Sequence, residues 1–273
     1  MKSEITAVTN QKGGVGKTTT TVNLGVALAM LGKKVLLVDG DPQGSLTISM
    51  GYRDPDNLTA TLSQVMMAEI EDRSIPPNFG IIHHAEGIDL LPANIDLSGV
   101  ELRLVNAMSR EQVLRSVLDR LRSQYDHILI DCMPSLGLMN INALAAADSV
   151  IIPLQPNYLS TKGLNLLLHS IARVRKQINP KLRIAGILFT MVDSRTNNAK
   201  SIISSLHSAV GSAIRIFKTE IPRSVRAAEA AENGKSIFLH DKNGKVANAY
   251  SSLAKEVTEH DRQIDRSWSD GAR

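Results

Sequence analysis

The feature that most constrains this chain is a glycine-rich run near its beginning. Residues 11–19 read Gln-Lys-Gly-Gly-Val-Gly-Lys-Thr-Thr, between an apolar run at residues 5–9 and a helical pattern at residues 18–31. Glycines allow backbone N–H groups to turn inward around a phosphate chain, and the positive end of the following helix favours the same anion. The order of strand, glycine loop and helix therefore predicts a nucleotide site.

The residues of this loop have separate expected tasks. Lys17 can reach the β- and γ-phosphates of a nucleoside triphosphate, and the Thr18 hydroxyl can bind Mg²⁺. The ordinary pattern G-x-x-x-x-G-K-[ST] asks for glycine where this chain has Gln11, and an additional lysine, Lys12, precedes the glycines. The other loop residues predicted to contact the nucleotide are Gly13, Gly14, Val15, Gly16 and Thr19. The alternative, a glycine turn with chance lysines, is disfavoured by the flanking strand and helix.

Aspartates follow two further apolar runs. Residues 35–38 lead into Asp39 and Asp41, and residues 128–130 lead into Asp131. Open α/β sheets bind ligands at the carboxyl ends of their strands, and phosphoryl transfer needs a group that orients water and a carboxylate near Mg²⁺. We therefore predict a metal site from Thr18, Asp39 and Asp131. A simple turn held by Asp39 and Asp41 is the alternative, weakened by the adjacent glycine loop.

Strand and helix patterns alternate over the rest of the chain. Further strands are expected at residues 34–38, 88–91, 127–130, 149–153, 183–190 and 217–221. Helices are expected at residues 59–71, 110–123, 161–177, 200–211 and 246–260. This alternation predicts a doubly wound α/β fold with a mostly parallel sheet flanked by helices. We expect a single P-loop NTPase domain over residues 1–262 and a polar C-terminal tail at residues 263–273.

Together, residues 11–19, 35–44 and 128–137 resemble the ParA/Soj partition ATPases, a family within the group that also contains MinD and the nitrogenase iron protein. Later segments at residues 190–197 and 221–226, and the short matches at residues 234–236, 249–250 and 253–254, resemble the same family, so the likeness covers nearly the whole chain. Two departures are visible. Met133 stands where many relatives have a second proline, and we expect no N-terminal helix-turn-helix domain, which some relatives have, because the loop begins at residue 11.

The resemblance implies ATP and Mg²⁺ as cofactors and a slow, partner-stimulated ATPase. It implies that Lys12, Lys17 and Asp41 are catalytic: Lys12 reaches across a dimer interface to the partner's ATP, and Asp41 positions the attacking water. Pro222 is expected to contact the nucleotide. The partners implied are a second copy joined through ATP, non-specific double-stranded DNA and a ParB-like adaptor protein.

The distribution of charge is compatible with DNA as a partner. Residues 1–140 carry 12 Lys and Arg against 16 Asp and Glu, whereas residues 141–273 carry 19 against 11. The predicted DNA contacts are Arg195, Lys200, Arg215, Lys218, Arg223 and Arg226. For each of them a surface ion pair is the alternative. Because no aromatic residues interleave with these cations, we expect binding that does not depend on base sequence.

Composition narrows the setting of the protein. The single cysteine, Cys132, rules out an internal disulfide framework, no apolar stretch reaches the roughly 20 residues of a membrane span, and no secretory signal is recognisable. We expect a cytoplasmic, nucleoid-associated protein without a membrane partner. The tail lacks the bulky apolar face of a MinD-like membrane helix, and one cysteine is too few for an iron–sulfur cluster. Two alternatives stay open: the same ATPase moving a protein cargo, and a small-molecule P-loop kinase or synthetase.

Overall fold

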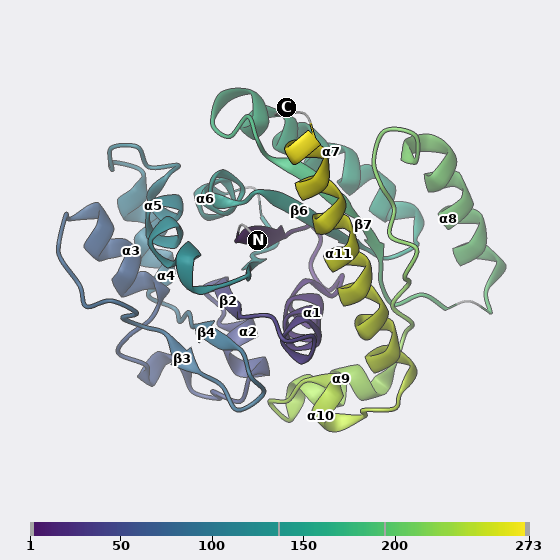
Figure 1. Ribbon diagram of the computed structural model, residues 1–273, viewed down its shortest axis with the longest axis horizontal. Coiled ribbons are helices and arrows are strands. Elements are labelled where there is room, and N and C mark those ends of the chain that lie inside the picture. Colours follow the sequence, from purple (N-terminus) through teal and green to yellow (C-terminus); the bar gives the residue numbers. More distant parts are fainter. Residues whose placement is uncertain (1–2, 136, 194, 271–273) are drawn as a thin grey trace.

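The computed structural model describes residues 3–135, 137–193 and 195–270 and contains a seven-stranded sheet (Figure 1). The strand order is β3-β4-β2-β5-β1-β6-β7, and all neighbours are parallel except β3, which pairs antiparallel with β4. The strands are β1 (Glu4–Val8), β2 (Val35–Gly40), β3 (Ile82–His83), β4 (Asp89–Leu91), β5 (His127–Cys132), β6 (Ser149–Leu154) and β7 (Arg183–Phe189).

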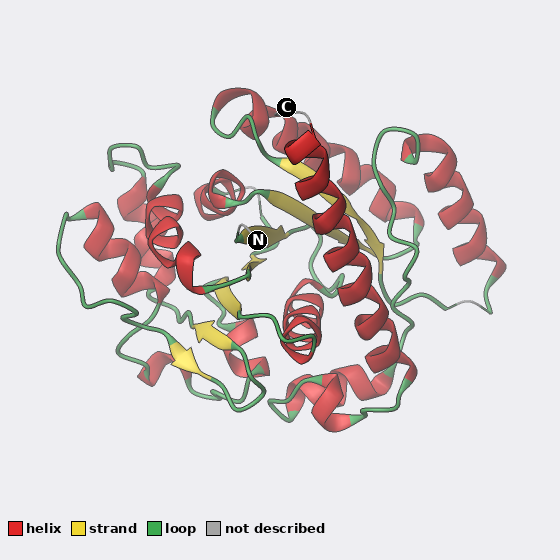
Figure 2. Cartoon of the chain, in the orientation of Figure 1, coloured by secondary structure: helices red, strands yellow, loops and turns green. Residues whose placement is uncertain are grey.

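Helices cover both faces of this sheet, as Figure 2 shows. One face carries α3 (Leu62–Ile70), α4 (Leu97–Leu104), α5 (Val113–Leu121), α6 (Leu138–Ala146), α7 (Tyr158–Gln177) and α8 (Asn197–Val210). The other carries α1 (Lys17–Met30), α2 (Ser45–Ser49), α9 (Val225–Glu232), α10 (Ile237–His240) and α11 (Lys245–Asp270). Short 3₁₀ turns lie at Pro55–Asn57 and Arg122–Gln124. Because helices shield both faces, every residue of β2, β5 and β6 is buried.

The helix after the glycine loop packs very closely on the sheet. A Cβ atom on Gly25 of α1 would lie 2.5 Å from Cδ2 of Leu37 on β2, so only glycine permits this approach. On its outer side, α1 meets α11, where the hydroxyls of Thr20 and Tyr250 lie 3.2 Å apart. These contacts fix the beginning of α1, and with it the end of the glycine loop.

The predicted doubly wound fold is confirmed, and most element boundaries differ from the prediction by only a few residues. The strand predicted at residues 217–221 is wrong: isolated bridges form at its two ends, Ile187–Ile216 and Val192–Pro222. Between them, only the backbone N–H groups of Phe217 and Ile221 donate to β7, to Ile187 and Phe189 at 2.9 Å each. The cause lies in α11, where the Glu256 carboxylate accepts the backbone N–H groups of Lys218 and Thr219 at 2.9 and 3.2 Å. Those donors are therefore not available to a neighbouring strand.

The last helix is longer than the sequence pattern predicted. We expected the ordered helix to end near residue 260, but α11 continues to Asp270. Residues 261–270 contain neither glycine nor proline, and Gly271 follows them, so no helix breaker occurs earlier. No described helix combines the length and apolar character that a bilayer crossing requires.

Candidate nucleotide-binding site

The glycine loop lies between the end of β1 and the beginning of α1. Gly14 and Gly16 adopt φ angles of +69° and +83°, a conformation that other residues rarely adopt, and the space beside Gly14 is open. Side chains from distant parts of the chain hold the loop. The Thr190 hydroxyl donates to the Val15 carbonyl at 2.8 Å, and Oδ1 of Asn10 accepts the Lys12 N–H at 3.1 Å. The backbone is thus fixed in the shape that a phosphate chain requires.

Lys17 begins α1 and points back into the loop. The side chain is buried, and its Nζ donates to the Lys12 carbonyl at 3.2 Å. Burial lowers the pKa of the Lys17 amine, while the nearby carboxyl of Asp131 acts in the opposite direction. Asp131 balances the charge of this buried amine only in part, and a bound phosphate would supply the remaining negative charge.

The Thr18 hydroxyl and Asp131, two of the three residues predicted to hold Mg²⁺, are in direct contact. The hydroxyl donates to Oδ2 of Asp131 at 2.7 Å, and Thr21 donates to Oδ1 at 3.4 Å. Burial, together with the neighbouring Asp39, raises the pKa of Asp131 to about 8. A divalent cation would relieve this unfavourable negative charge.

Asp39 and Asp131 are direct neighbours in the register of β2 and β5. Gly40 permits this pairing, because a Cβ atom there would lie 2.7 Å from the Asp131 carbonyl oxygen. Both oxygens of Asp39 accept bonds from its own loop: Oδ2 from the N–H and hydroxyl of Thr47 at 2.9 and 2.7 Å, and Oδ1 from the Asp41 N–H at 3.2 Å. Burial raises the pKa of Asp39 to about 7. In this arrangement Asp39 organises residues 41–47 beside the glycine loop.

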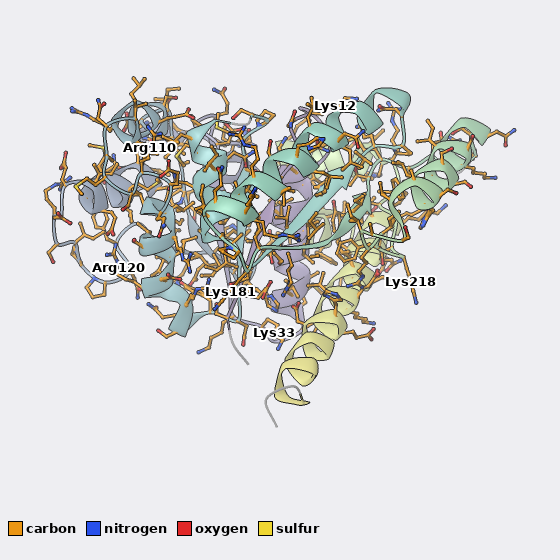
Figure 3. The ribbon with its side chains drawn as sticks, turned by 90° about the horizontal axis from the view of Figure 1, so that it is seen from above. Lys12, Lys33, Arg110, Arg120, Lys181 and Lys218 are labelled. Atoms are coloured by element: carbon orange, nitrogen blue, oxygen red, sulfur yellow. The ribbon has the colours of Figure 1, made fainter. Side chains whose placement is uncertain are left out.

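Asp41 and Lys12 are less buried than these residues. Asp41 accepts the Gln43 N–H at 3.0 Å in a tight turn at the carboxyl edge of the sheet. The Lys12 Nζ donates to the Asn157 side chain at 3.3 Å, just beyond β6. Figure 3 places Lys12 at the periphery of the molecule, as a residue that meets a second copy would be.

The donors present suit Mg²⁺ bound together with phosphates. No group of three or more His, Cys, Asp and Glu residues able to hold a metal occurs among the described residues. Mg²⁺ usually keeps several waters and takes its other ligands from one or two protein groups and the phosphates. The Thr18 hydroxyl with Asp131 behind it fits that requirement.

A cavity of about 820 Å³ lies next to the loop. Its lining includes Gly16 and Thr19 from the loop and α1, and Pro222 from the segment beside β7. A contact between Pro222 and the nucleotide stays a prediction. Arg195 and Arg223, two predicted DNA contacts, line the same cavity. The structure thus brings together nucleotide and DNA candidates that are far apart in the sequence.

The six predicted DNA contacts differ in availability. Arg195 is 87% exposed and forms a bidentate pair with Asp193 at 2.9 and 2.8 Å. Lys200, Lys218 and Arg223 are also exposed. Arg226 is exposed and lies 3.2 Å from Glu229.

Arg215 is the least suited of the six to bind DNA. Its guanidinium lies over the Phe217 ring, 4.9 Å from the centroid, and donates to Glu256 at 3.1 Å. For Arg215, the alternative to a DNA contact, an ion pair within the protein, is the better interpretation.

Several residues that shape the site were not predicted. Thr47, Asn157 and Thr190 hold Asp39, Lys12 and Val15 respectively. Thr190 lies 175 residues from Val15 in the sequence, and no local pattern marks such a contact. Of these three residues, only Thr47 lies close in the sequence to a predicted site residue of its own segment, because it belongs to the short helix that begins directly after the turn containing Asp41.

The glycine loop, its buried lysine and the paired aspartates define a P-loop nucleotide-binding protein. The family model described as an AAA domain matches residues 3–184. Soj of Bacillus subtilis (strain 168) is 44% identical over 254 residues, which are 93% of this chain and 98% of that protein. The chromosome partitioning protein ParA of Caulobacter vibrioides (strain NA1000 / CB15N) is 40% identical over 265 residues, 95% and 96% of the two chains. This chain belongs to the Soj/ParA family of chromosome-partitioning P-loop ATPases.

Solved structures agree with this assignment. Cobyrinic acid a,c-diamide synthase from Mycobacterium smegmatis, crystallised with an ATP analogue and magnesium, superimposes with a TM-score of 0.82 at 36% identity. The match covers 94% of this chain and 95% of that chain.

Proposed function

We propose that this protein is an ATP-dependent switch that partitions DNA. In the ATP state two copies associate and hold duplex DNA without sequence preference, and hydrolysis releases it. The observation that carries the proposal is the shared cavity, which is lined both by the nucleotide candidates Gly16 and Thr19 and by the DNA candidates Arg195 and Arg223. A change in the nucleotide therefore acts directly beside the residues expected to contact DNA.

The residues of the site have distinct parts in this cycle. Lys17 neutralises the triphosphate, and Thr18 and Asp131 hold Mg²⁺, Asp131 through water. Asp41 orients the attacking water, and Asp39 keeps the loop that bears Asp41 in place. Bound ATP supplies a γ-phosphate that ADP lacks, and only such a differential contact can shift an association equilibrium.

Lys12 is the residue proposed to sense the second copy. Its amine already reaches beyond its own loop to the Asn157 side chain. In the dimer it would exchange this contact for the phosphates bound by the partner. Doubling the basic surface by dimerisation would steepen the salt dependence of DNA binding, because each neutralised phosphate adds about 0.9 to the slope. We further propose a ParB-like adaptor as the stimulating partner and the nucleoid as the place of action.

A small-molecule synthetase is the rival function, because a solved structure named a synthase is 36% identical to this chain. The two functions differ in what the nucleotide controls. A partition switch changes its mass and its DNA affinity with ATP, whereas a synthetase transfers phosphate or an amide to a metabolite without involving DNA. Transport of a protein cargo would retain the first behaviour and differ only in the adaptor.

The test combines sedimentation velocity with binding to a long duplex, each with ATP, ADP and no nucleotide. The Asp41→Ala variant should bind ATP, form the dimer and retain DNA without hydrolysing. The Arg195→Ala/Arg223→Ala variant should form the same ATP dimer and lose most DNA affinity. Equal mass and equal DNA binding in all three nucleotide states would exclude the switch.

A further inference from the structure

The positive charge of the chain is concentrated in residues 149–219. This segment holds ten Lys and Arg against one acidic residue, Asp193, while the rest of the chain holds 21 against 26. The chain as a whole carries +4, so its entire positive excess lies in this one segment. A concentration of one sign on one part of a fold is the electrostatic footprint of a surface that binds a polyanion.

Some of these cations are already engaged in the structure. Arg183 pairs with Glu4, Arg195 with Asp193 and Arg215 with Glu256. A separate group lies at the C-terminal end of α7 and just beyond it, and we call it the α7 basic surface: Arg173, Arg175, Lys176 and Lys181. All four are exposed, and no ion pair of theirs occurs within the described part of the chain. This surface was not among the DNA contacts predicted from the sequence.

The α7 basic surface has a fixed position, away from the nucleotide edge. β6 ends at the carboxyl edge of the sheet and β7 begins at the amino edge, so α7, which connects them, ends at the amino edge. Figure 3 labels Lys12, which lies at the nucleotide edge, and Lys181, which lies toward the amino edge. Asn179 anchors the turn after α7 by donating to the carbonyls of Leu144 and Ala147 at 3.1 and 2.7 Å. Two copies that meet through Lys12 would leave this surface open to solvent.

Duplex DNA suits this surface better than a membrane does. The apolar side of α7 is already used by the core, where Leu164, Leu167 and Ile171 are buried. Leu166 is the one large hydrophobic residue exposed on the described part of α7, so the helix has no apolar face to insert into lipid. No aromatic residue is among the exposed large hydrophobics of the described side chains, which argues against stacking on single-stranded bases.

The spacing of the cations also fits a phosphate backbone. Arg173 and Lys176 are three residues apart on α7, so their side chains leave the helix about 5–6 Å apart on one side. Contacts of this kind, made to phosphates by cations with no carboxylate beside them, position a protein on DNA without reading its sequence.

We propose that the α7 basic surface is a second contact site for the backbone of duplex DNA, distinct from the contacts expected at Arg195 and Arg223. The inference rests on the proposed function because that function identifies DNA as the ligand. It does not depend on control of DNA binding by the nucleotide. Because the surface lies at the amino edge of the sheet, it contributes with or without ATP. Each dimer would carry two such outlying sites.

The test measures binding to a short duplex of mixed sequence from 50 to 200 mM NaCl, with no nucleotide, ADP or ATP. The Arg173→Gln/Lys176→Gln variant should bind about ten-fold more weakly, and its log–log salt slope should fall by about 2 in every nucleotide state. The control is Arg115→Gln/Arg120→Gln, which removes the same charge from α5, where these arginines pair with Asp119 and Glu69. The Arg173→Lys/Lys176→Arg variant should retain the parent slope.

A helix-stabilising role is the plain alternative, because cations near the C-terminal end of a helix, such as Lys176 in the last turn of α7, interact favourably with the helix dipole. That role would lower the thermal midpoint of the Gln variant and leave the salt slope unchanged, which would overturn the proposal. An equal loss of DNA affinity in the α5 control variant would overturn the proposal too. So would an α7 Gln variant that no longer sediments with phosphatidylglycerol vesicles but binds DNA as the parent does. If the parent binds DNA equally in all nucleotide states while the α7 variant lowers the slope, the switch fails and this inference stands.

Discussion

The protein holds its charges in two opposite ways. At the nucleotide site Lys17, Asp39 and Asp131 are buried, and each has hydrogen-bond partners within the site. Along α7, Arg173 and Lys176 are exposed and form no ion pair in the described structure. Burial makes each charge of the first group costly to leave unsatisfied, whereas salt screens each charge of the second. Single substitutions should therefore have large effects in the first region, and only combined substitutions in the second.

Ion pairs show a related contrast between residues 1–140 and residues 149–219, where Arg183 and Arg215 pair only with acids from outside the segment. In the N-terminal half, arginines such as Arg110, Arg120 and Arg122 lie close to acidic residues. Within residues 149–219 the only acidic side chain is Asp193, and it is taken by Arg195. Paired cations contribute modestly to stability, but cations without partners keep their charge available for a ligand. The difference separates a surface that maintains the fold from one suited to binding DNA.

The largest expected effect belongs to the buried lysine. Lys17→Ala should weaken ATP binding by about 100-fold or more, because losing one member of a buried charge contact costs about 2–5 kcal/mol. Fluorescent ATP titration measures this change. Lys12→Ala is the matched control: it should bind ATP within a few-fold of the parent but fail to form the ATP dimer in sedimentation velocity. Similar ATP affinities for parent and Lys17→Ala would remove the contrast between the two regions.

A buried titratable group far from the nucleotide, His127, should also show a large effect. Both ring nitrogens of His127, at the beginning of β5, are buried without a partner in the described structure, and burial and the nearby Lys33 lower its pKa to about 4. The unfolded chain takes up this proton near pH 6.5 and the folded chain only near pH 4. Stability contributed by neutral His127 is therefore complete above about pH 6.5 and is lost as the pH falls toward 4.

The substitution His127→Leu tests this dependence. Urea unfolding of the variant should show about 2 kcal/mol less loss of stability than the parent between pH 7 and pH 4. The comparison with the parent is needed because Glu4, with its pKa raised by burial to about 7, changes stability in the opposite direction over this range. Parallel pH curves for the two proteins would mean that His127 is not a buried neutral group.

The smallest effect is expected at the exposed pair between Asp193 and Arg195. Asp193→Asn should tighten DNA binding about two- to five-fold, because it releases the arginine from a bidentate partner and exposed pairs are worth about 0.2–1 kcal/mol. Glu220→Gln removes the same charge from an exposed side chain that lines a small cavity with Val192, the neighbour of Asp193, and should change affinity less. Equal gains in the two variants would indicate a general charge effect only. Fluorescence anisotropy at low salt has the sensitivity for both.

Much of the site was predictable because its chemistry is written in short segments. Gly13 to Thr19 are adjacent in the chain, and a strand before them with a helix after them leaves few conformations for the loop. Asp39 and Asp131 each end an apolar run, and parallel strands bring their carboxyl ends to one edge of the sheet, as the register of β2 and β5 confirms. Local pattern and strand direction together were sufficient to place these residues.

Other predictions depended on contacts that no local pattern contains. The strand expected at residues 217–221 does not form because Glu256 of α11 takes the backbone donors of Lys218 and Thr219. The same carboxylate holds Arg215, which the charge pattern alone had placed among the DNA contacts. In both cases a side chain about 40 residues farther along the chain decides the outcome.

The sequence by itself determined the class of the protein: a glycine loop, a buried lysine and strand-ending aspartates in a doubly wound order. The tertiary structure decided which charges are available and which are held. Burial and pairing depend on which helices meet across the sheet, so they set the pKa of His127, the partner of Lys12 and the exposure of α7. A charge has the same identity in any chain, but its energy depends on what surrounds it.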